Sequence, residues 1–153
     1  MLPSALTDVI EALSRLPGVG SRTAERYAYF LLKADQNVAK NIATSLEHLH
    51  DGVKSCPKTF ALMSDNDELS PLYDDPRRDK TTVLVVEEAL DIYAIENTKS
   101  YDGTYHVLGG AISPMDGITA DKLHIKELIA RVEEDQVQEI IIATNPSVEG
   151  EST

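Results

Sequence analysis

Two short apolar runs, each followed by acidic or amide residues, constrain the fold of this chain more than any other feature. Residues 83–86 read VLVV and lead into Glu87, and residues 140–143 read IIIA and lead into a second polar segment. Continuous β-branched runs of this length are typical of strands buried on both faces of a parallel sheet. The carboxyl ends of such strands line a crevice, so we expect the polar side chains that follow them to gather along one edge. These are Glu87, Glu88, Asp91, Asn145 and Glu149.

This acidic edge resembles the metal-binding module of the Toprim family, which occurs in topoisomerases and primases. Glu87 stands at the position of the module's lone glutamate, and Asp91 stands at the position of its helix acid. Active Toprim enzymes carry two aspartates in a T-D-P-D-x-E-G-E pattern, whereas residues 144–151 of this chain read TNPSVEGE. Amide and hydroxyl ligands are neutral, so most of the charge that would hold Mg²⁺ against its hydration shell is missing. The resemblance therefore implies a Rossmann-like Toprim sheet that is catalytically inert.

Charge is distributed unevenly along the chain. The 153 residues have a formal net charge of −12, but residues 1–50 carry five basic and five acidic side chains, whereas residues 51–153 carry nine and twenty-one. Binding to nucleic acid phosphates depends on Lys and Arg, so the amino-terminal part is the better candidate for such a role. No apolar run approaches the roughly 20 residues of a membrane span, and the first residues do not resemble a secretory signal. Because the single Cys56 also fits a reducing compartment, we expect a cytoplasmic protein that does not bind membranes.

Residues 1–52 predict helices joined by a tight glycine turn. Apolar residues repeat at helical spacing from Leu6 to Leu16, and a second amphipathic helix follows the PGVG turn of residues 17–20, with Ser21 as its expected N-cap. Two glycines let a ligand approach the backbone closely, and the N–H groups that begin the second helix form an anion site. A third helix, from Val38 to Leu49, is expected to pack on the first two.

The spacing L-P-G-V-G-x-R-x-A-x-R resembles the helix-hairpin-helix motif, which binds the sugar-phosphate backbone without reading sequence. Four basic residues lie between Arg15 and Lys33 against the single acid Glu25, which favours phosphate binding. The alternative is a simple αα-hairpin whose glycines only make the turn and whose arginines are solvated. The DNA-binding hypothesis names Arg15, Gly18, Val19, Gly20, Ser21, Arg22, Arg26 and Lys33.

Residues 53–80 lack clear periodicity and are rich in Asp, Ser, Pro and Asn, which predicts a long loop or a small irregular module. The segment ends in the sequence DPRRD at residues 75–79. Together with the stretches VVEE, YHVLGGAISPMDGI and ATNPSVEGE, this box resembles the RecR family of recombination mediators. Arg77 and Arg78 within it are expected to meet either a phosphate or an acidic neighbour.

The RecR resemblance implies a four-cysteine zinc ribbon in residues 53–80. Its ligand positions fall on Cys56, Thr59, Ser70 and Tyr73, so Cys56 is the only surviving ligand. Structural zinc sites use four Cys or His donors, and we therefore expect no metal and no cofactor. His48 and His50 nearby are expected to lie on the surface and not to bind a metal, and His106 and His124, which have no catalytic partner in view, are expected to be structural. An apolar cluster is expected where the metal would lie, formed by Phe60, Leu62, Met63, Leu69, Leu72 and Tyr73.

These observations predict an α+β chain that contains an α/β sheet. We expect a helix-hairpin-helix region at residues 1–52, a degenerate zinc-ribbon segment at 53–80 and an incomplete Toprim domain at 81–153. Family members continue beyond this point into a tail that helps to lock subunits into a ring, so a truncated form or a fragment, and formation of a homo-oligomer, stay open.

The resemblance implies a non-enzymatic, DNA-binding mediator of recombinational repair, which acts with RecO and RecF to load recombinase on gapped single-stranded DNA. The acidic edge would dock a basic partner, RecO by resemblance. One alternative is a small Mg²⁺-dependent nuclease that uses Glu87, Asp91 and Glu149. Another is a protein-binding fragment without DNA affinity, because a single hairpin motif without avidity binds weakly.

Overall fold

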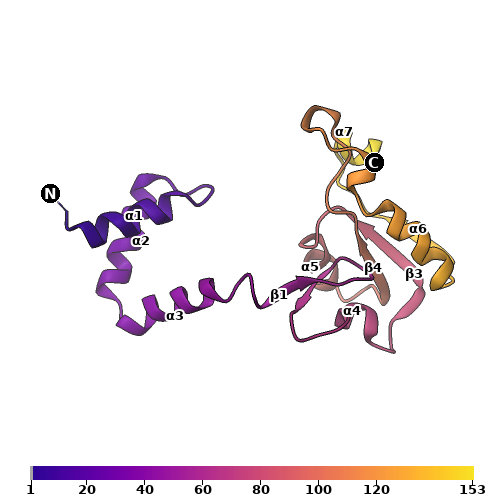
Figure 1. The fold of residues 1–153 in the computed structure, drawn as a ribbon, viewed down its shortest axis with the longest axis horizontal. Helices are drawn as coiled ribbons and strands as arrows, with labels where there is room; N and C mark the ends of the chain where they lie inside the picture. The colour runs from indigo at the N-terminus through magenta and orange to yellow at the C-terminus, as the bar shows by residue number, and fades with distance from the viewer. Residues whose placement is uncertain (1) are drawn as a thin grey trace. The chain divides into compact units, whose positions relative to one another are not determined.

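In the computed structural model, which describes residues 2–153, the chain forms two compact units that divide between His50 and Asp51 (Figure 1). The first unit is helical, and the second combines helices with parallel and antiparallel strands. The predicted mixture of α-helix and parallel sheet is thus confirmed. Within the described residues, no helix has the length and apolar character needed to cross a membrane.

The first unit consists of three helices, α1 (Ser4–Ser14), α2 (Ser21–Lys33) and α3 (Gln36–Glu47). Only Ala24 and Ala28 are buried on α2, and their small side chains let α1 approach closely. Asp35 is the N-cap of α3, and its carboxylate accepts a hydrogen bond from the Asn37 N–H at 2.8 Å. None of the residues of α3 is buried, so the expected packing of its apolar face on the first two helices is wrong. That face stays exposed at Val38, Ile42 and Leu46.

The second unit is built on a three-stranded parallel sheet with the strand order β4-β3-β5. Its strands are β3 (Asp79–Val86), β4 (Gly103–Val107) and β5 (Glu139–Ile142). The helices after β3 are α5 (Asp91–Glu96), α6 (Ile125–Glu134) and α7 (Val148–Ser152), with 3-10 turns at Pro114–Asp116 and Ala120–Lys122. Before the sheet, residues 53–80 form the antiparallel pair β1 (Val53–Ser55) and β2 (Leu62–Ser64), then α4 (Pro71–Asp74).

The central strand β3 contributes to a hydrophobic core on both faces of the sheet. Val83 and Val85 lie on the face that carries Leu128 of α6, while Leu84 and Val86 lie on the opposite face. Full burial of each such side chain stabilises the fold by about 1.5–3 kcal/mol. The predicted burial of residues 83–86 on both faces is therefore seen in the structure.

Strand β5 does not share this burial. Ile140, Ile141 and Ile142 are 41%, 36% and 64% exposed, so the expected burial of this run on both faces is wrong. The reason is position, because β5 pairs with β3 on one side only and forms an edge of the sheet. An apolar run alone does not distinguish a central strand from an edge strand.

Candidate nucleic-acid interface and acidic edge

The turn between α1 and α2 leaves backbone donors without side-chain acceptors. The turn is closed by a hydrogen bond from the Val19 N–H to the Leu16 carbonyl at 3.0 Å. Gly20 is the N-cap of α2, and no side chain caps the helix, so the expected N-cap Ser21 is instead the first helical residue. This correction follows from the Gly20 carbonyl, which accepts the first intrahelical bond, from Ala24, at 3.0 Å. The N–H groups of the first turn are therefore free to meet an anion.

The two glycines of this turn have different roles. Gly18 has a φ of +77°, a conformation that other residues rarely adopt. Gly20 has a φ of −78°, which any residue accommodates. A Cβ atom added to either residue would meet nothing within 4 Å. Gly20 is therefore needed neither for the backbone conformation nor for internal packing, and its missing side chain matters only for a ligand that approaches from outside.

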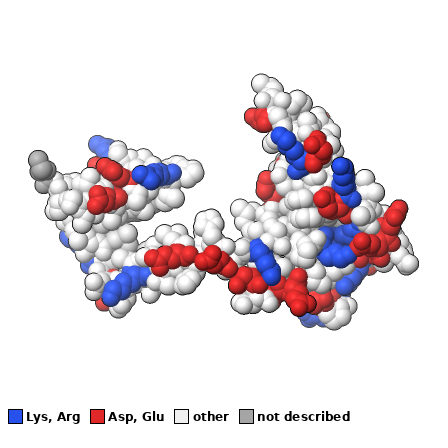
Figure 2. Space-filling view, viewed as in Figure 1, with Lys and Arg blue, Asp and Glu red and all other residues white. Residues whose placement is uncertain are grey.

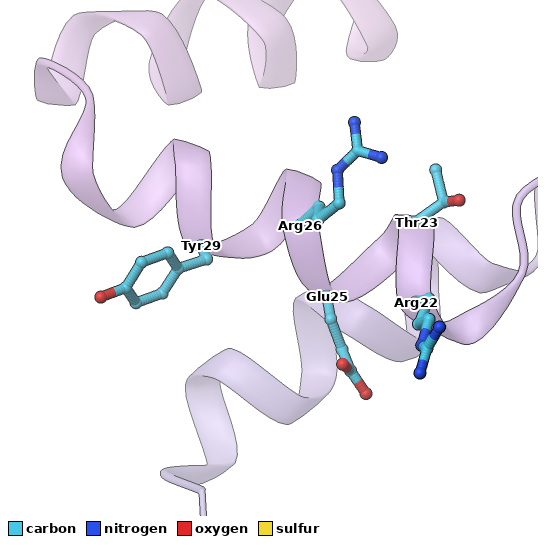
Figure 3. A pocket seen from close by; sticks show the side chains of 5 residues that line it. All are labelled: Arg22, Thr23, Glu25, Arg26 and Tyr29. Carbon is cyan, nitrogen blue, oxygen red and sulfur yellow. The ribbon is translucent and has the colours of Figure 1, made fainter.

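Arg22 and Arg26 lie on α2 directly after this turn. With Thr23, Glu25 and Tyr29 they line an open hollow, in which Arg22 and Glu25 extend to one side and Arg26 and Thr23 to the other (Figure 3). None of the ion pairs among residues 2–153 involves either arginine. Unpaired guanidinium groups beside free backbone N–H groups are suited to phosphate oxygens.

Two further predicted DNA contacts flank these arginines in the sequence. Arg15 is the C-cap residue of α1, and Lys33 ends α2 with its ammonium 4.7 Å from the centre of the Tyr29 ring. Acidic and basic side chains are visible on both units (Figure 2). The first unit has as many basic as acidic residues, whereas acidic residues outnumber basic ones in residues 51–153.

At the acidic edge, the structure joins Glu87 to Asn145. Strands β3 and β5 are in register with Val85 opposite Ile142, so the residues that follow the two strands meet. Glu87 is 7% exposed, and both of its carboxylate oxygens accept hydrogen bonds from Asn145. The Asn145 backbone N–H donates to Oε1 at 2.8 Å, and the side-chain Nδ2 donates to Oε2 at 2.7 Å. An aspartate at position 145 has no side-chain N–H and could not make the second bond.

The loop after β5 folds back over this pair. The Ser147 hydroxyl accepts a hydrogen bond from the Gly150 N–H at 3.0 Å and caps α7. Gly150 is buried, and a Cβ atom there would lie 2.0 Å from the Asn145 carbonyl oxygen and 2.9 Å from Glu87 Oε1. Only glycine fits this position. Ser147 and Asn145, the two departures from the active Toprim pattern, thus both have structural partners.

The other acidic side chains do not converge on Glu87. Asp91 accepts a hydrogen bond from the Glu88 N–H at 2.9 Å and so stabilises the start of α5. Glu88 and Glu149 are exposed. Within residues 2–153, no three His, Cys, Asp or Glu side chains are grouped so that they could hold a metal ion. Of the five residues expected at this edge, contact is therefore seen between Glu87 and Asn145 and, separately, between Glu88 and Asp91.

The four positions of the zinc-ribbon resemblance all lie in the interior. Cys56, Thr59, Ser70 and Tyr73 are between 0% and 6% exposed, and the Ser70 N–H donates to the Cys56 sulfur at 3.4 Å. Burial opposes ionisation of this thiol, but hydrogen bonds from the Thr59 side chain and from neighbouring backbone N–H groups lower the pKa of Cys56 below its ordinary value. One thiol, two hydroxyls and a phenol do not supply the Cys or His donors of a structural zinc site, so these residues do not fit the metal.

Tyr73 is the clearest departure from a metal ligand. Its hydroxyl donates to Asp135 Oδ1 at 2.8 Å and so already has a partner outside residues 53–80. Burial, followed by the hydrogen bond to Asp135, raises the pKa of Tyr73 to about 12, so the phenol stays protonated near neutral pH. The expected apolar cluster is also wrong in part, because Leu62 is 48% exposed and polar side chains occupy the interior. Asp135 was not predicted, and its only signal in the sequence is its spacing of four residues from Arg131.

The arginines of the DPRRD box and two of the histidines have structural contacts. Arg77 pairs with Asp75 at 2.7 Å, and the largely buried Arg78 pairs with Glu96 at 2.7 Å. His106 is fully buried, with its Nε2 2.7 Å from the His124 carbonyl oxygen, and the ring of His124 stacks on Phe60. The acidic-neighbour alternative for Arg77 and Arg78 is thus the one that the structure shows.

Comparison with known proteins gives these features a family. A family model described as "RecR, helix-hairpin-helix" matches residues 6–50, and a Toprim domain model matches residues 81–153. Recombination protein RecR of Frankia alni is 44% identical over 153 residues, which cover all of this chain and 76% of that protein. The chain belongs to the RecR family. The RecR proteins of Moorella thermoacetica (46% identity, 99% of this chain and 75% of that protein) and Chloroflexus aggregans (44%, 100% and 74%) are similar over the same region. The resemblance inferred from the sequence motifs is confirmed.

Proposed function

We propose that this chain is a DNA-binding mediator of recombinational repair in the cytoplasm, and that it holds DNA through the turn between α1 and α2. The observation that carries the proposal is the juxtaposition of an uncapped helix start with two arginines that have no acidic partner among residues 2–153. The name of its relatives, recombination protein RecR, supports the same role.

The predicted mode of binding is independent of sequence. Free N–H groups after Gly20 would receive one phosphate, and Arg22 and Arg26 would contact its neighbours. Hydrogen bonds to phosphates position a protein on DNA but carry no information about the bases. Such binding suits a protein that must act wherever gapped or single-stranded DNA arises.

We further propose that the chain has no nuclease activity. Both oxygens of Glu87 are engaged by Asn145, and Asp91 is engaged by a backbone N–H group. A Mg²⁺-dependent enzyme would need these carboxylates to hold the ion and orient a scissile phosphate. The exposed acids Glu88 and Glu149 would instead attract a basic surface on a partner, for which RecO is the candidate, with RecF acting in the same assembly.

The DNA-binding proposal is tested with the double variant R22A/R26A. Anisotropy titrations with labelled DNA of two unrelated sequences should show affinity reduced about tenfold or more for both, with a shallower dependence on salt. The matched control is K40A, which removes an exposed cation from α3 in the same unit. Unchanged affinity for R22A/R26A, or an equal loss for K40A, would remove the α2 surface as the binding site.

The acidic-edge proposal is tested with the charge reversal E88K/E149K. Affinity for purified RecO should fall while DNA affinity stays the same or rises, and the control E133K should leave partner binding unchanged. Unaltered RecO affinity would rule out docking at this edge. Plasmid cleavage by the unmodified chain in Mg²⁺ or Mn²⁺, lost on substitution of Glu87, would favour the nuclease alternative.

A further inference from the structure

Residues 53–75 contain two tight turns. Because these residues do not supply the ligands of a metal ion, something else must hold the two turns in place. The first turn, residues 56–61, closes with a hydrogen bond from the Cys56 N–H to the Ala61 carbonyl at 2.8 Å. The second turn, residues 70–74, closes with a bond from the Tyr73 N–H to the Ser70 carbonyl at 2.8 Å. The direct polar link between them is the 3.4 Å hydrogen bond from the Ser70 N–H to the Cys56 sulfur, and sulfur is a weak acceptor.

Both turns are instead connected to consecutive residues at the end of α6. Lys58 of the first turn forms an ion pair with Glu134. Tyr73 of the second turn donates its hydroxyl to Asp135 at 2.8 Å. The two links differ in strength, because the side chains of Lys58 and Glu134 are 40% and 57% exposed, whereas that of Asp135 is 11% exposed. Exposed ion pairs contribute little, so the bond from Tyr73 is the stronger link.

Arg131 fixes the Asp135 carboxylate in position. Its Nε donates to Asp135 Oδ2 at 2.9 Å, which leaves Oδ1 for the Tyr73 hydroxyl. The guanidinium also donates to the Tyr105 carbonyl oxygen and the Thr104 hydroxyl of β4, and its carbon lies 5.1 Å from the centre of the Tyr73 ring. Arg131 is 2% exposed, so this network is anchored in the interior of the sheet domain.

The first turn has its own contacts with β4 and with His124, the N-cap residue of α6. The Val107 N–H donates to the Thr59 carbonyl at 2.8 Å, and the Phe60 ring stacks on His124 with ring centres 3.6 Å apart. Each turn is thus held against β4 or the end of α6, rather than by an atom between the turns. This arrangement removes the need for a central cross-link.

We propose that the end of α6, through Asp135 oriented by Arg131 and assisted by Glu134, clamps the two turns from outside and does the work that a zinc ion does in a zinc ribbon. Residues 53–75 then keep their fold without metal. The assignment rests on contacts within the second unit and is independent of DNA binding by the first.

The clamp is tested by the single variants Y73F and D135A and by the double variant. Y73F keeps the ring against Arg131 but removes the hydroxyl, and it should lower the melting temperature by roughly 5 °C and speed amide exchange in residues 56–61 and 70–74. In the D135A background Y73F should add little, because D135A already removes the oxygen that accepts the Tyr73 hydroxyl. The control Y93F removes the hydroxyl of an exposed tyrosine and should change neither measurement. Additive losses in the double variant, or an equal loss for Y93F, would overturn the clamp.

A second experiment tests whether a bound zinc ion can hold the two turns in place of the contact from Tyr73 to Asp135. The triple variant T59C/S70C/Y73C supplies three thiols beside Cys56 at four buried positions and removes the Tyr73 hydroxyl. We expect it to lose amide protection in both turns without metal, to bind one Zn²⁺ per chain and to regain protection when it does. The unmodified chain should contain no stoichiometric zinc by elemental analysis and should be unaffected by chelator. One zinc per unmodified chain, or a triple variant that stays protected without metal, would refute the proposal.

Discussion

Replacing Asn145 with aspartate restores one carboxylate of the active Toprim pattern and tests whether the pair of Glu87 and Asn145 stabilises the acidic edge. The substitution preserves shape but removes the Nδ2 donor that lies 2.7 Å from Glu87 Oε2. A lost hydrogen bond to a charged group costs about 1.5–3 kcal/mol. Two carboxylates about 4 Å apart repel each other by up to about 4 kcal/mol at an effective dielectric constant of about 20.

Solvent reduces this repulsion, because Asn145 itself is exposed. We therefore expect the free energy of local opening to fall by about 3 kcal/mol in total. Since 1.36 kcal/mol corresponds to a factor of ten, the backbone amide of residue 145, which donates to Glu87 at 2.8 Å, should exchange about 100-fold faster.

Hydrogen exchange followed by mass spectrometry on peptides that cover residues 83–88 and 143–150 measures this effect locally. A local readout is needed because a chain with two units need not unfold in one step. The control N66D places the same charge in an exposed turn after β2 and should leave these peptides unchanged. Added Mg²⁺ should slow exchange in N145D, where two carboxylates now meet, but not in the unmodified chain. Wild-type exchange rates in N145D would refute the view that the amide holds this edge together.

Two further predictions concern the turn and the core. G20A should leave the melting temperature unchanged but lower DNA affinity several-fold, because the added methyl group lies in the open space beside the free N–H groups. Unchanged affinity would show that DNA does not approach the backbone at this turn. Burial, opposed by a hydrogen bond to the His124 backbone, lowers the pKa of His106 from 6.5 to about 4, so the unfolded chain binds a proton that the folded chain does not. Stability should therefore be fully present above about pH 6.5 and fall by up to about 3 kcal/mol as the pH drops toward 4. Urea midpoints measured across this range should show a slope that H106Q reduces, and an equal slope in H106Q would assign the acid sensitivity to other groups.

The sequence predicted those features that depend on local pattern and motif. The run at residues 83–86 correctly indicated a buried strand, and the PGVG turn correctly indicated two helices joined by a tight hairpin. The chain does not reveal strand order, so the same argument failed for Ile140–Ile142, which form an edge. Ser21 is a good N-cap by type, but the helix begins one residue earlier than that role requires, with Gly20 as its cap.

Contacts between distant segments were the harder part. Motif comparison placed Glu87 and Asn145 at one edge, but it did not show that the amide would donate to the acid. The link from Tyr73 to Asp135 spans 62 residues and leaves no periodic signal in the sequence. The expectation of an apolar cluster followed from composition, whereas the interior is organised by one buried arginine that satisfies several acceptors at once.

The division of the chain into a charge-balanced unit and a strongly acidic one has a consequence for measurements with DNA. Residues 1–50 carry no net charge and residues 51–153 carry all of the excess of −12, so a nearby duplex attracts the arginines of α2 while it repels the sheet domain. Added salt screens both forces. Counterion release by the first unit makes affinity fall as salt rises, whereas screening of the repulsion from the second unit makes affinity rise. The measured slope of affinity against salt concentration is therefore the difference between these two effects. The number of phosphate contacts calculated from that slope will therefore be smaller than the true number. The same repulsion will favour encounters in which the turn between α1 and α2 reaches the DNA before the sheet domain does.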